Sequence, residues 1–263
     1  MSALTEGPAL QATSLTVRFG GVVALQDVSI EIPANQITAV IGPNGAGKTT
    51  FFNAVCGFVR PQSGEITYRG RTLAGVNPHQ LTGLGISRTL QGLGLWHGLT
   101  VAENVMAGAR RQGRPGFAWA LLGLPRADHD EARVRDAALA VLKELGIERY
   151  ADFYPATLPF GVQKWVALAR ALASEPSLLL LDEPASGLTE SEIKELTERL
   201  RGWRERMTIA LVEHRLDLVM SASDRVTVLD FGQVIAAGTP AAVQADPAVV
   251  AAYLGEELDV ADA

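Results

Sequence analysis

The chain contains Gly42-Pro43-Asn44-Gly45-Ala46-Gly47-Lys48-Thr49, which fits the pattern G-x-x-x-x-G-K-T of a phosphate-binding loop at every fixed position. Glycines let such a loop curl until several backbone N–H groups point at one phosphate, because they have no Cβ to clash. We expect Lys48 to reach the β- and γ-phosphates and the Thr49 hydroxyl to hold Mg²⁺. The loop therefore predicts a bound triphosphate with its metal ion.

The residues on either side of this loop have the character that phosphate binding requires. Residues 36–41 are typical of a short strand, and residues 50–56, which begin with Thr50, are typical of a helix. A strand, the loop and a helix in this order place the phosphates at a helix N-terminus, where backbone N–H groups favour anions. A glycine-rich turn that matched by chance would not be expected in this context.

Composition limits the class of protein. The 263 residues are 48% hydrophobic and 20% charged with a formal net charge of −6, which does not suggest a broad nucleic-acid-binding surface. Residues 1–11 lack the features of a signal peptide, and the longest apolar candidate, residues 117–124, is far shorter than the ~20 residues of a membrane span. We therefore expect a soluble chain that meets a membrane only through a partner. The lone Cys56 is expected to be a small buried residue.

Periodicity in the first two thirds of the chain predicts strands followed by helices. Residues 14–19 and 28–32 alternate with period two, and Gly20-Gly21 marks a turn between them. Residues 130–145 repeat apolar side chains at helical spacing, and Gly146 is the expected C-cap. Residues 111–115, rich in Gly, Pro and Arg, are expected to form an exposed loop.

Strand patterns return in the last third of the chain. Residues 178–181 and 208–212 are continuous apolar runs of the kind found in buried parallel strands, and residues 191–203 between them are typical of an amphipathic helix. This order predicts a right-handed crossover and a parallel sheet. Residues 225–229 and 233–236 predict a closing hairpin.

An acidic pair, Asp182-Glu183, ends the first of these apolar runs. The carboxyl end of a buried strand is where an α/β sheet places its ligand groups. Asp182 can reach the Mg²⁺ that Thr49 holds, and Glu183 can orient or deprotonate an attacking water. Alone such a pair is usually a solvated strand end, but together with the phosphate loop it predicts hydrolysis of the triphosphate.

With these motifs in place, the chain resembles the ATP-binding subunit of ABC transporters over about residues 12–255. The resemblance implies an α/β fold with a P-loop NTPase (RecA-like) core, a small antiparallel β subdomain and an inserted α-helical subdomain. It implies a single ATPase domain over residues 12–263, in which residues 12–91 and 172–240 form the core with its β subdomain. Residues 92–171 would form the helical subdomain, and residues 241–263 a C-terminal helix and tail.

Further segments follow in the order of that family. Phe19 matches the aromatic residue that contacts adenine, and Gln91 matches the glutamine loop that contacts Mg²⁺ and senses the membrane partner. Residues 158–163 stand at the signature sequence, residues 186–189 at the loop that crosses between subunits, and His214 at the switch histidine of the γ-phosphate. Singly these residues would be a core aromatic, a loop glutamine and a solvated histidine. The other histidines are expected at the surface: His79, His97 and His129.

The motifs and the resemblance together give a candidate site for ATP and Mg²⁺. Its catalytic residues are Lys48, Gln91, Glu183 and His214, and its metal ligands are Thr49, Gln91 and Asp182. Its nucleotide-binding residues are Phe19, Gly42, Pro43, Asn44, Gly45, Ala46, Gly47, Lys48, Thr49, Thr50 and Gly161.

The signature segment departs from the family's usual Leu-Ser-Gly-Gly-Gln. Pro159 and Phe160 replace its serine and first glycine, and Val162 replaces its glutamine. Pro159 offers neither a hydroxyl nor an N–H, although the N–H groups of Gly161 and Val162 at a helix start could still bind phosphate. We therefore predict two unequal ATP sites in a dimer. Thr189, where the family has Asp, leaves the contact between subunits open.

Softer features are similar to the branched-chain amino-acid uptake subfamily. They are residues 18–21, the Leu-x-x-Gly form of the signature, the long middle segment 113–130 and the ending at residues 252–255. The resemblance implies a second ATPase subunit, favouring a heterodimer over a homodimer, two transmembrane permease subunits and, indirectly, a solute-binding protein. It implies a place at the cytoplasmic face of the inner membrane. Residues 117–124 either contact a permease or pack within the helical subdomain, and we favour packing.

Other functions remain as alternatives. Relatives in this subfamily import urea and short amides, and lipopolysaccharide-export ATPases are close in sequence. A soluble ABC ATPase acting on DNA or ribosomes is disfavoured, because the chain has one cassette, no sustained heptads and no basic stripe. A small-molecule kinase would have no use for Gln91, the signature and His214 in this order. A subunit that binds ATP without hydrolysing it is disfavoured by Lys48, Asp182 and Glu183.

Overall fold

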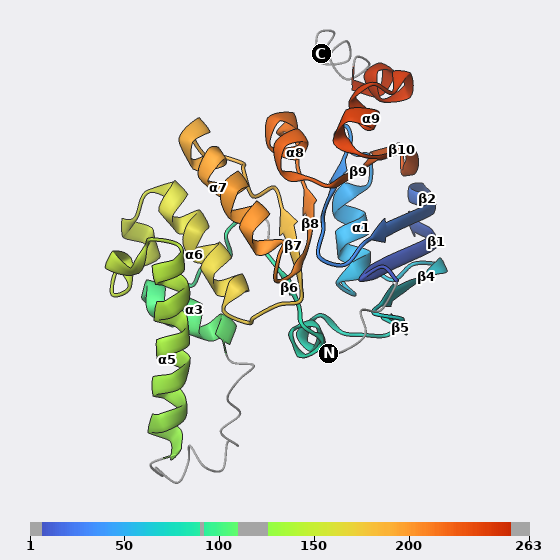
Figure 1. Ribbon diagram of the computed structural model, residues 1–263. Helices are drawn as coiled ribbons and strands as arrows, with labels where there is room; N and C mark the ends of the chain where they lie inside the picture. The colour runs from blue at the N-terminus through green and yellow to red at the C-terminus, as the bar shows by residue number, and fades with distance from the viewer. Residues whose placement is uncertain (1–6, 90–91, 110–125, 254–263) are drawn as a thin grey trace.

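A computed structural model describes residues 7–89, 92–109 and 126–253 and shows two sheets with helices packed around them (Figure 1). The larger sheet has the order β10-β9-β3-β8-β7-β6. Its strands are β3 (Ile37–Ile41), β6 (Ile86–Arg88), β7 (Leu178–Asp182), β8 (Thr208–Val212), β9 (Arg225–Asp230) and β10 (Gln233–Gly238). Neighbouring strands are parallel except β9 and β10, which form the predicted hairpin.

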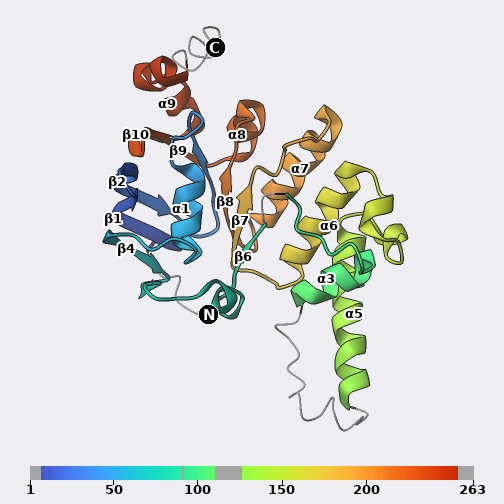
Figure 2. The same ribbon diagram turned by 180° about the vertical axis from the view of Figure 1, so that it is seen from behind.

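The smaller sheet is antiparallel with the order β2-β1-β4-β5. It contains β1 (Leu10–Phe19), β2 (Val22–Ile32), β4 (Ser63–Tyr68) and the short β5 (Arg71–Thr72). Helix α1 (Lys48–Val55) lies between the two sheets (Figures 1 and 2). Its Phe51 and Phe52 are fully buried in one apolar cluster with residues of β1, β2 and β7.

Side chains of the central strands alternate between two cores. In β7, Leu178 and Leu180 face the cluster around α1, whereas Leu179 and Leu181 face the second cluster. That second cluster is formed with the helices on the other face, because successive side chains of a strand point to opposite faces. The helices there are α3 (Val101–Ala109), α5 (Arg126–Glu144), α6 (Phe160–Leu172), α7 (Glu190–Trp203) and α8 (Leu216–Ala222).

Helices α3, α5 and α6 pack together at one side of the molecule, beyond β6 (Figure 1). The short elements α2 (Leu81–Leu84) and α9 (Pro240–Gln244), and the single turns Pro78–Gln80, Glu148–Tyr150 and Pro155–Thr157, connect the larger parts. No helix among the described residues is both long and apolar enough to cross a membrane. The residue limits predicted for the core and the helical subdomain stay predictions.

The parallel crossover through α7 and the hairpin predicted from sequence are confirmed. The strands predicted at residues 14–19 and 28–32 are also present, but β1 and β2 begin four and six residues earlier, and the helix ends shift as well. Helix α1 begins at Lys48, two residues before the predicted start, because Gly47 with φ 101° turns the chain directly into it. It ends at Val55, so Cys56 is buried just beyond the helix rather than within it. Residues 111–115 and 117–124 lie outside the described residues.

Helix packing depends on a glycine in α3. A Cβ at Gly108 would overlap the backbone carbonyl of Arg170 in α6, whereas a Cβ at Gly202 in α7 would meet nothing within 4 Å. We predict that Gly108→Ala lowers the free energy of unfolding by about 1–3 kcal/mol through overpacking. The matched control Gly202→Ala should raise it by about 0.5 kcal/mol, because alanine is the better helix former. Urea unfolding of both variants measures this difference, and equal effects would contradict the close helix contact.

Candidate functional site

The phosphate loop follows β3 and adopts a conformation that needs glycine. Gly42, Gly45 and Gly47 have φ of 146°, 78° and 101°. A Cβ at Gly42 would overlap the carbonyl oxygen of Leu229 in β9, and one at Gly47 would lie 2.6 Å from the carbonyl oxygen of Ala24. The loop is therefore pressed between its neighbouring strands, which fixes the direction of its backbone.

Lys48, Thr49 and Thr50 form the first turn of α1, immediately after the loop. The Lys48 side chain is buried, and its Nζ donates to the carbonyl oxygens of Gly42 and Pro43 at 2.6 and 2.7 Å. A cation is thus fixed inside the curl of the loop. The first helical turn offers backbone N–H groups beside it, so the region suits a polyanion.

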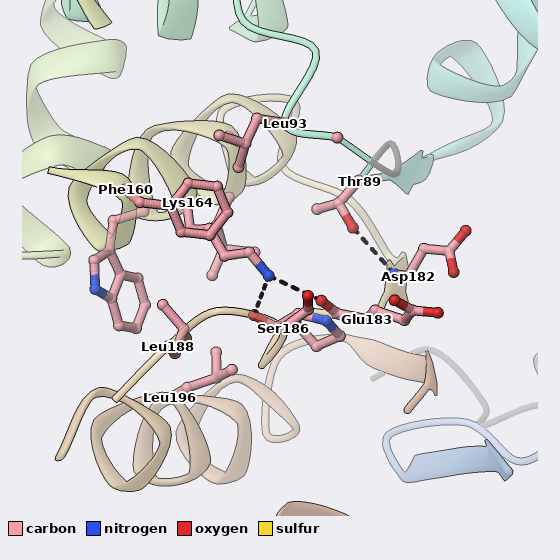
Figure 3. A pocket seen from close by; sticks show the side chains of 14 residues that line it. Thr89, Leu93, Phe160, Lys164, Asp182, Glu183, Ser186, Leu188 and Leu196 are labelled. Carbon is pink, nitrogen blue, oxygen red and sulfur yellow. Dashed lines mark hydrogen bonds between the residues drawn. The ribbon is translucent and has the colours of Figure 1, made fainter. Parts of the chain in front are cut away.

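Asp182, the last residue of β7, is buried and is linked through Arg88 to helix α1, which follows the loop. Its Oδ2 accepts a hydrogen bond from Arg88 at 2.7 Å, and Arg88 also donates to Asn53 of α1 at 2.7 Å. The other oxygen, Oδ1, is buried and has no hydrogen-bond partner among the described residues. Because a buried carboxylate oxygen without a partner is costly, this atom fits a role as a cation ligand. The backbone N–H of Asp182 donates to Thr89 Oγ1 at 3.2 Å (Figure 3).

Glu183 and His214 come from adjacent strands and meet at the same edge of the sheet. Glu183 follows β7, and its Oε1 lies 3.0 Å from His214 Nε2, two residues beyond β8. Glu183 has φ 49°, a left-handed conformation that costs a non-glycine residue roughly 1–3 kcal/mol. Such strain persists only where the surroundings hold it, so the backbone here fixes the direction of the carboxylate.

Glu213 is a buried site residue that the sequence analysis missed. Its Oε1 accepts from the Ala185 N–H at 2.6 Å, and its Oε2 accepts from the N–H groups of His214 and Arg215 at 2.9 and 3.1 Å. One carboxylate therefore joins the segment after β7 to the segment after β8. A glutamate beside a candidate histidine, at the end of an apolar run, was the available signal.

These elements make a site at one edge of a parallel sheet. A loop of backbone N–H groups, a lysine, a Glu–His pair and a carboxylate oxygen without a partner among the described residues converge there. A family model described as ABC transporter matches residues 25–186, and a second, described as branched-chain amino acid ATP-binding cassette transporter, matches residues 233–259. The chain belongs to the ABC transporter family. The predicted family and fold class are confirmed, and this ABC subunit binds and hydrolyses ATP.

Relatives of this ABC subunit match it over nearly its whole length. It is 39% identical over 251 residues to the high-affinity branched-chain amino acid transport ATP-binding protein LivG of Salmonella typhimurium, covering 95% of this chain and 98% of the relative. It is 36% identical to BraF of Pseudomonas aeruginosa, over 95% of this chain and 98% of that relative. It is 35% identical to BraG of the same organism, over 94% of this chain and 99% of that relative, and both carry the same description as LivG. The solved structure of a nucleotide-free cassette from an ABC transporter has a TM-score of 0.81 and 28% identity, over 93% of this chain and 98% of that one.

The signature segment of this ABC subunit begins helix α6. Pro159 is the N-cap and provides no side-chain hydrogen bond, and Gly161 is buried where a Cβ would overlap the Glu192 carboxylate of α7. Phe160 is 49% exposed, and its ring lies so close to Gly187 that a Cβ there would be 2.6 Å from Phe160 Cε1. The altered signature is therefore packed against the loop before α7.

The remaining predicted residues of this ABC subunit are spread around the site. Phe19 ends β1 and is 52% exposed, so its ring is open to solvent. Thr189 is the N-cap of α7 and forms a capping box with Glu192, which gives it a structural role. His79 and His97 are exposed as predicted, whereas Gln91 and the side chain of His129 lie outside the described residues.

We predict that Glu213→Gln destabilises the protein by about 2 kcal/mol, because the NH2 group of glutamine cannot accept a hydrogen bond and at least one of the three backbone N–H groups then loses its acceptor. Glu198 of α7 is exposed, so the control variant Glu198→Gln should stay within about 0.5 kcal/mol of the unchanged protein. Urea unfolding compares the two. Equal stabilities would show that Glu213 does not hold the segments after β7 and β8 together.

Proposed function

We propose that this ABC ATPase powers an importer of branched-chain amino acids. The observation that carries the ATPase part is the convergence of Lys48, Asp182, Glu183 and His214 at one edge of the sheet. Support for the solute comes from the relatives, which are named for branched-chain amino acid transport, and from the match at residues 233–259. Import, and a place at the cytoplasmic face of the inner membrane, are proposed by the same similarity.

The roles of the site residues follow from their chemistry. The backbone of residues 42–47, the Lys48 ammonium and the start of α1 with Thr50 would bind the phosphates, and Phe19 would stack on the base. Thr49, Gln91 and Asp182 would hold Mg²⁺, which when bound neutralises charge on the phosphates. The Asp182 oxygen without a described partner supports this assignment.

Hydrolysis would depend on the Glu183–His214 pair. The Glu183 carboxylate, held in one direction by its strained backbone, would accept a proton from the attacking water or orient it. His214, 3.0 Å from that carboxylate, would hold it in place and reach the γ-phosphate. Since phosphoryl transfer is mostly positioning and charge neutralisation, rigid placement of these groups is the chain's main contribution.

We further propose that the chain works in a heterodimer with a second ATPase subunit. In an ABC dimer each ATP is closed by the partner's signature segment, and here Pro159 provides no cap at the start of α6. Phe160 adds bulk beside Gly187, on the surface that such closure would use. These changes would slow hydrolysis at the partner's ATP site, which this chain's signature segment would close. The ATP site built on this chain's own phosphate loop would retain Lys48 and Glu183.

A cleft of about 940 Å³ between the sheet and the helices α3 and α6 is the proposed docking place for a permease. Two exposed aromatic side chains, Phe58 and Trp96, line it together with Arg88 and Arg170. An amphipathic cytoplasmic helix could bury its apolar face against these rings. Two permease subunits, and through them a solute-binding protein, would complete the transporter.

Purification of the tagged chain from gently solubilised membranes tests this assembly. We expect two membrane subunits, a second ATPase with an intact signature and a solute-binding protein that binds leucine, isoleucine or valine in a titration. Phe58→Ser should abolish co-purification of the membrane subunits, because it removes an apolar contact from the cleft. The control Val22→Ser, at an exposed apolar residue outside the cleft, should retain them. Recovery of ribosomes or DNA would contradict transport, and a binding protein that prefers urea or an amide would contradict the proposed solute.

Restoring the signature tests the unequal sites. We predict that Pro159→Ser combined with Phe160→Gly raises ATP turnover of the assembled complex at least twofold, because the second site regains a hydroxyl and loses the bulky ring. The exposed pair Phe153→Ser and Tyr154→Ser lies outside the signature and should leave turnover unchanged. A smaller rise than twofold in the restored variant would exclude the unequal-site model.

A further inference from the structure

Helix α6 carries a lysine that contacts the backbone of the proposed catalytic glutamate. Lys164, the fifth residue of α6, is half-buried, and its Nζ donates to the carbonyl oxygens of Glu183 and Pro184 at 3.0 and 3.1 Å (Figure 3). Lys164 Nζ lies over the face of the Phe160 ring, 5.8 Å from the ring centroid, and this cation–π contact favours a cation at this place. The known family motifs give no role to this side chain in the mechanism proposed above.

The backbone that Lys164 contacts is strained and is held from three sides. Glu183 has φ 49°, its N–H donates to the Val212 carbonyl of β8 at 2.9 Å, and its carbonyl also accepts from the Ser186 N–H at 3.2 Å. The third hydrogen bond, from Lys164, comes from helix α6 rather than from the sheet or the segment that follows β7. Because φ sets where the side chain leaves the backbone, a bond to the Glu183 carbonyl also restrains its carboxylate.

The environment of Lys164 makes this contact more than a surface hydrogen bond. Burial lowers the pKa of the Lys164 ammonium, while the negative charges of Glu213 and Glu183 act in the opposite direction. The side chain borders a cavity of about 170 Å³ whose other walls include Leu168, Leu188 and Leu196 (Figure 3). At this half-buried place a charge-assisted bond to a carbonyl is stronger than at the open surface. Its loss would leave the Glu183 carbonyl with the Ser186 N–H as its remaining donor among the described residues and would weaken the restraint on this backbone.

The same helix repeats this arrangement near its other end. Arg170 donates to the carbonyl oxygens of Leu93 and Gly94 at 3.1 and 2.5 Å, and Leu93 is also a non-glycine residue in the left-handed region, with φ 62°. Two cations of α6 thus bond the carbonyls of two strained residues, one after β6 and one after β7. Since six residues of helix span about 9 Å, α6 is a short rigid link between the two strained segments.

We propose that Lys164 is a positioning residue that fixes the catalytic direction of Glu183 from helix α6, so that hydrolysis depends on where this helix sits against the sheet. The inference rests on the proposed role of Glu183. It differs from the recognition of phosphate by the signature segment, because Lys164 acts within its own subunit and on a backbone carbonyl.

The test measures steady-state ATP hydrolysis and ATP binding in the purified transporter complex. Lys164→Met, which keeps an unbranched side chain shorter by one atom and removes its charge and donors, should lower kcat at least tenfold and change the Kd for ATP less than twofold. Lys164→Arg, which retains charge and donors, should recover kcat to within about threefold of the unchanged complex. The exposed Lys194 of α7 is the matched control, and Lys194→Met should leave both quantities unchanged.

A double-mutant cycle separates positioning from a structural effect. If Lys164 acts through Glu183, then Lys164→Met should lower single-turnover hydrolysis less than twofold when Glu183→Gln is already present. A full tenfold further loss, or an unchanged kcat in Lys164→Met alone, would overturn the proposal. Lys164→Gln, which keeps an uncharged NH2 donor group on a shorter side chain, replaces the methionine variant if that one does not fold, with an expected kcat between those of Met and Arg.

The cycle also distinguishes this inference from the proposed function. It reads hydrolysis alone, so its result stands whatever solute the complex transports. If Glu183→Gln hydrolyses ATP at the unchanged rate, the role of Glu183 and the inference on Lys164 fall together. If Glu183→Gln is impaired and Lys164→Met is not, only the inference on Lys164 falls.

Discussion

The site depends on the register of three parallel strands. Val40 of β3 pairs with Val212 of β8, and Val212 pairs with Asp182 of β7, so the three strands end along one row. The phosphate loop, the Glu183 segment and the Glu213–His214 segment leave the sheet at neighbouring points of that row. Parallel strands accumulate ligand groups at their carboxyl edge in this way, and a slip of one residue in β7 would remove Asp182 from the row.

Much of this arrangement could be predicted from sequence because its signals are local. The glycine spacing at residues 42–47, the apolar run ending in Asp182 and the hairpin after residue 225 each lie within a few residues. What the sequence analysis missed are pairs far apart in the chain. Arg88 beside Asp182, Lys164 beside Glu183 and Glu213 beside Ala185 arise only when the sheet and helices assemble, and residue types alone do not reveal them.

Helix ends and the signature segment show a second limit. The shift of α1 to Lys48 follows from the left-handed Gly47, a backbone angle that sequence periodicity does not measure. Thr189 looked like a departure from the family pattern, yet in the structure it caps α7 together with Glu192. Because aspartate caps a helix at least as well as threonine, this position can keep its structural role in spite of the difference.

The ion pair between Arg88 and Asp182 bears on the stability of the fold between catalytic cycles, when the site is empty. Arg88 neutralises Asp182, bonds Asn53 of α1 and lies over the rings of Phe52 and Phe58. A buried carboxylate that faced no positive charge would lower the stability of the fold each time nucleotide and metal dissociate. With a resident counter-ion, the subunit can empty its site repeatedly and remain folded, ready to be refilled.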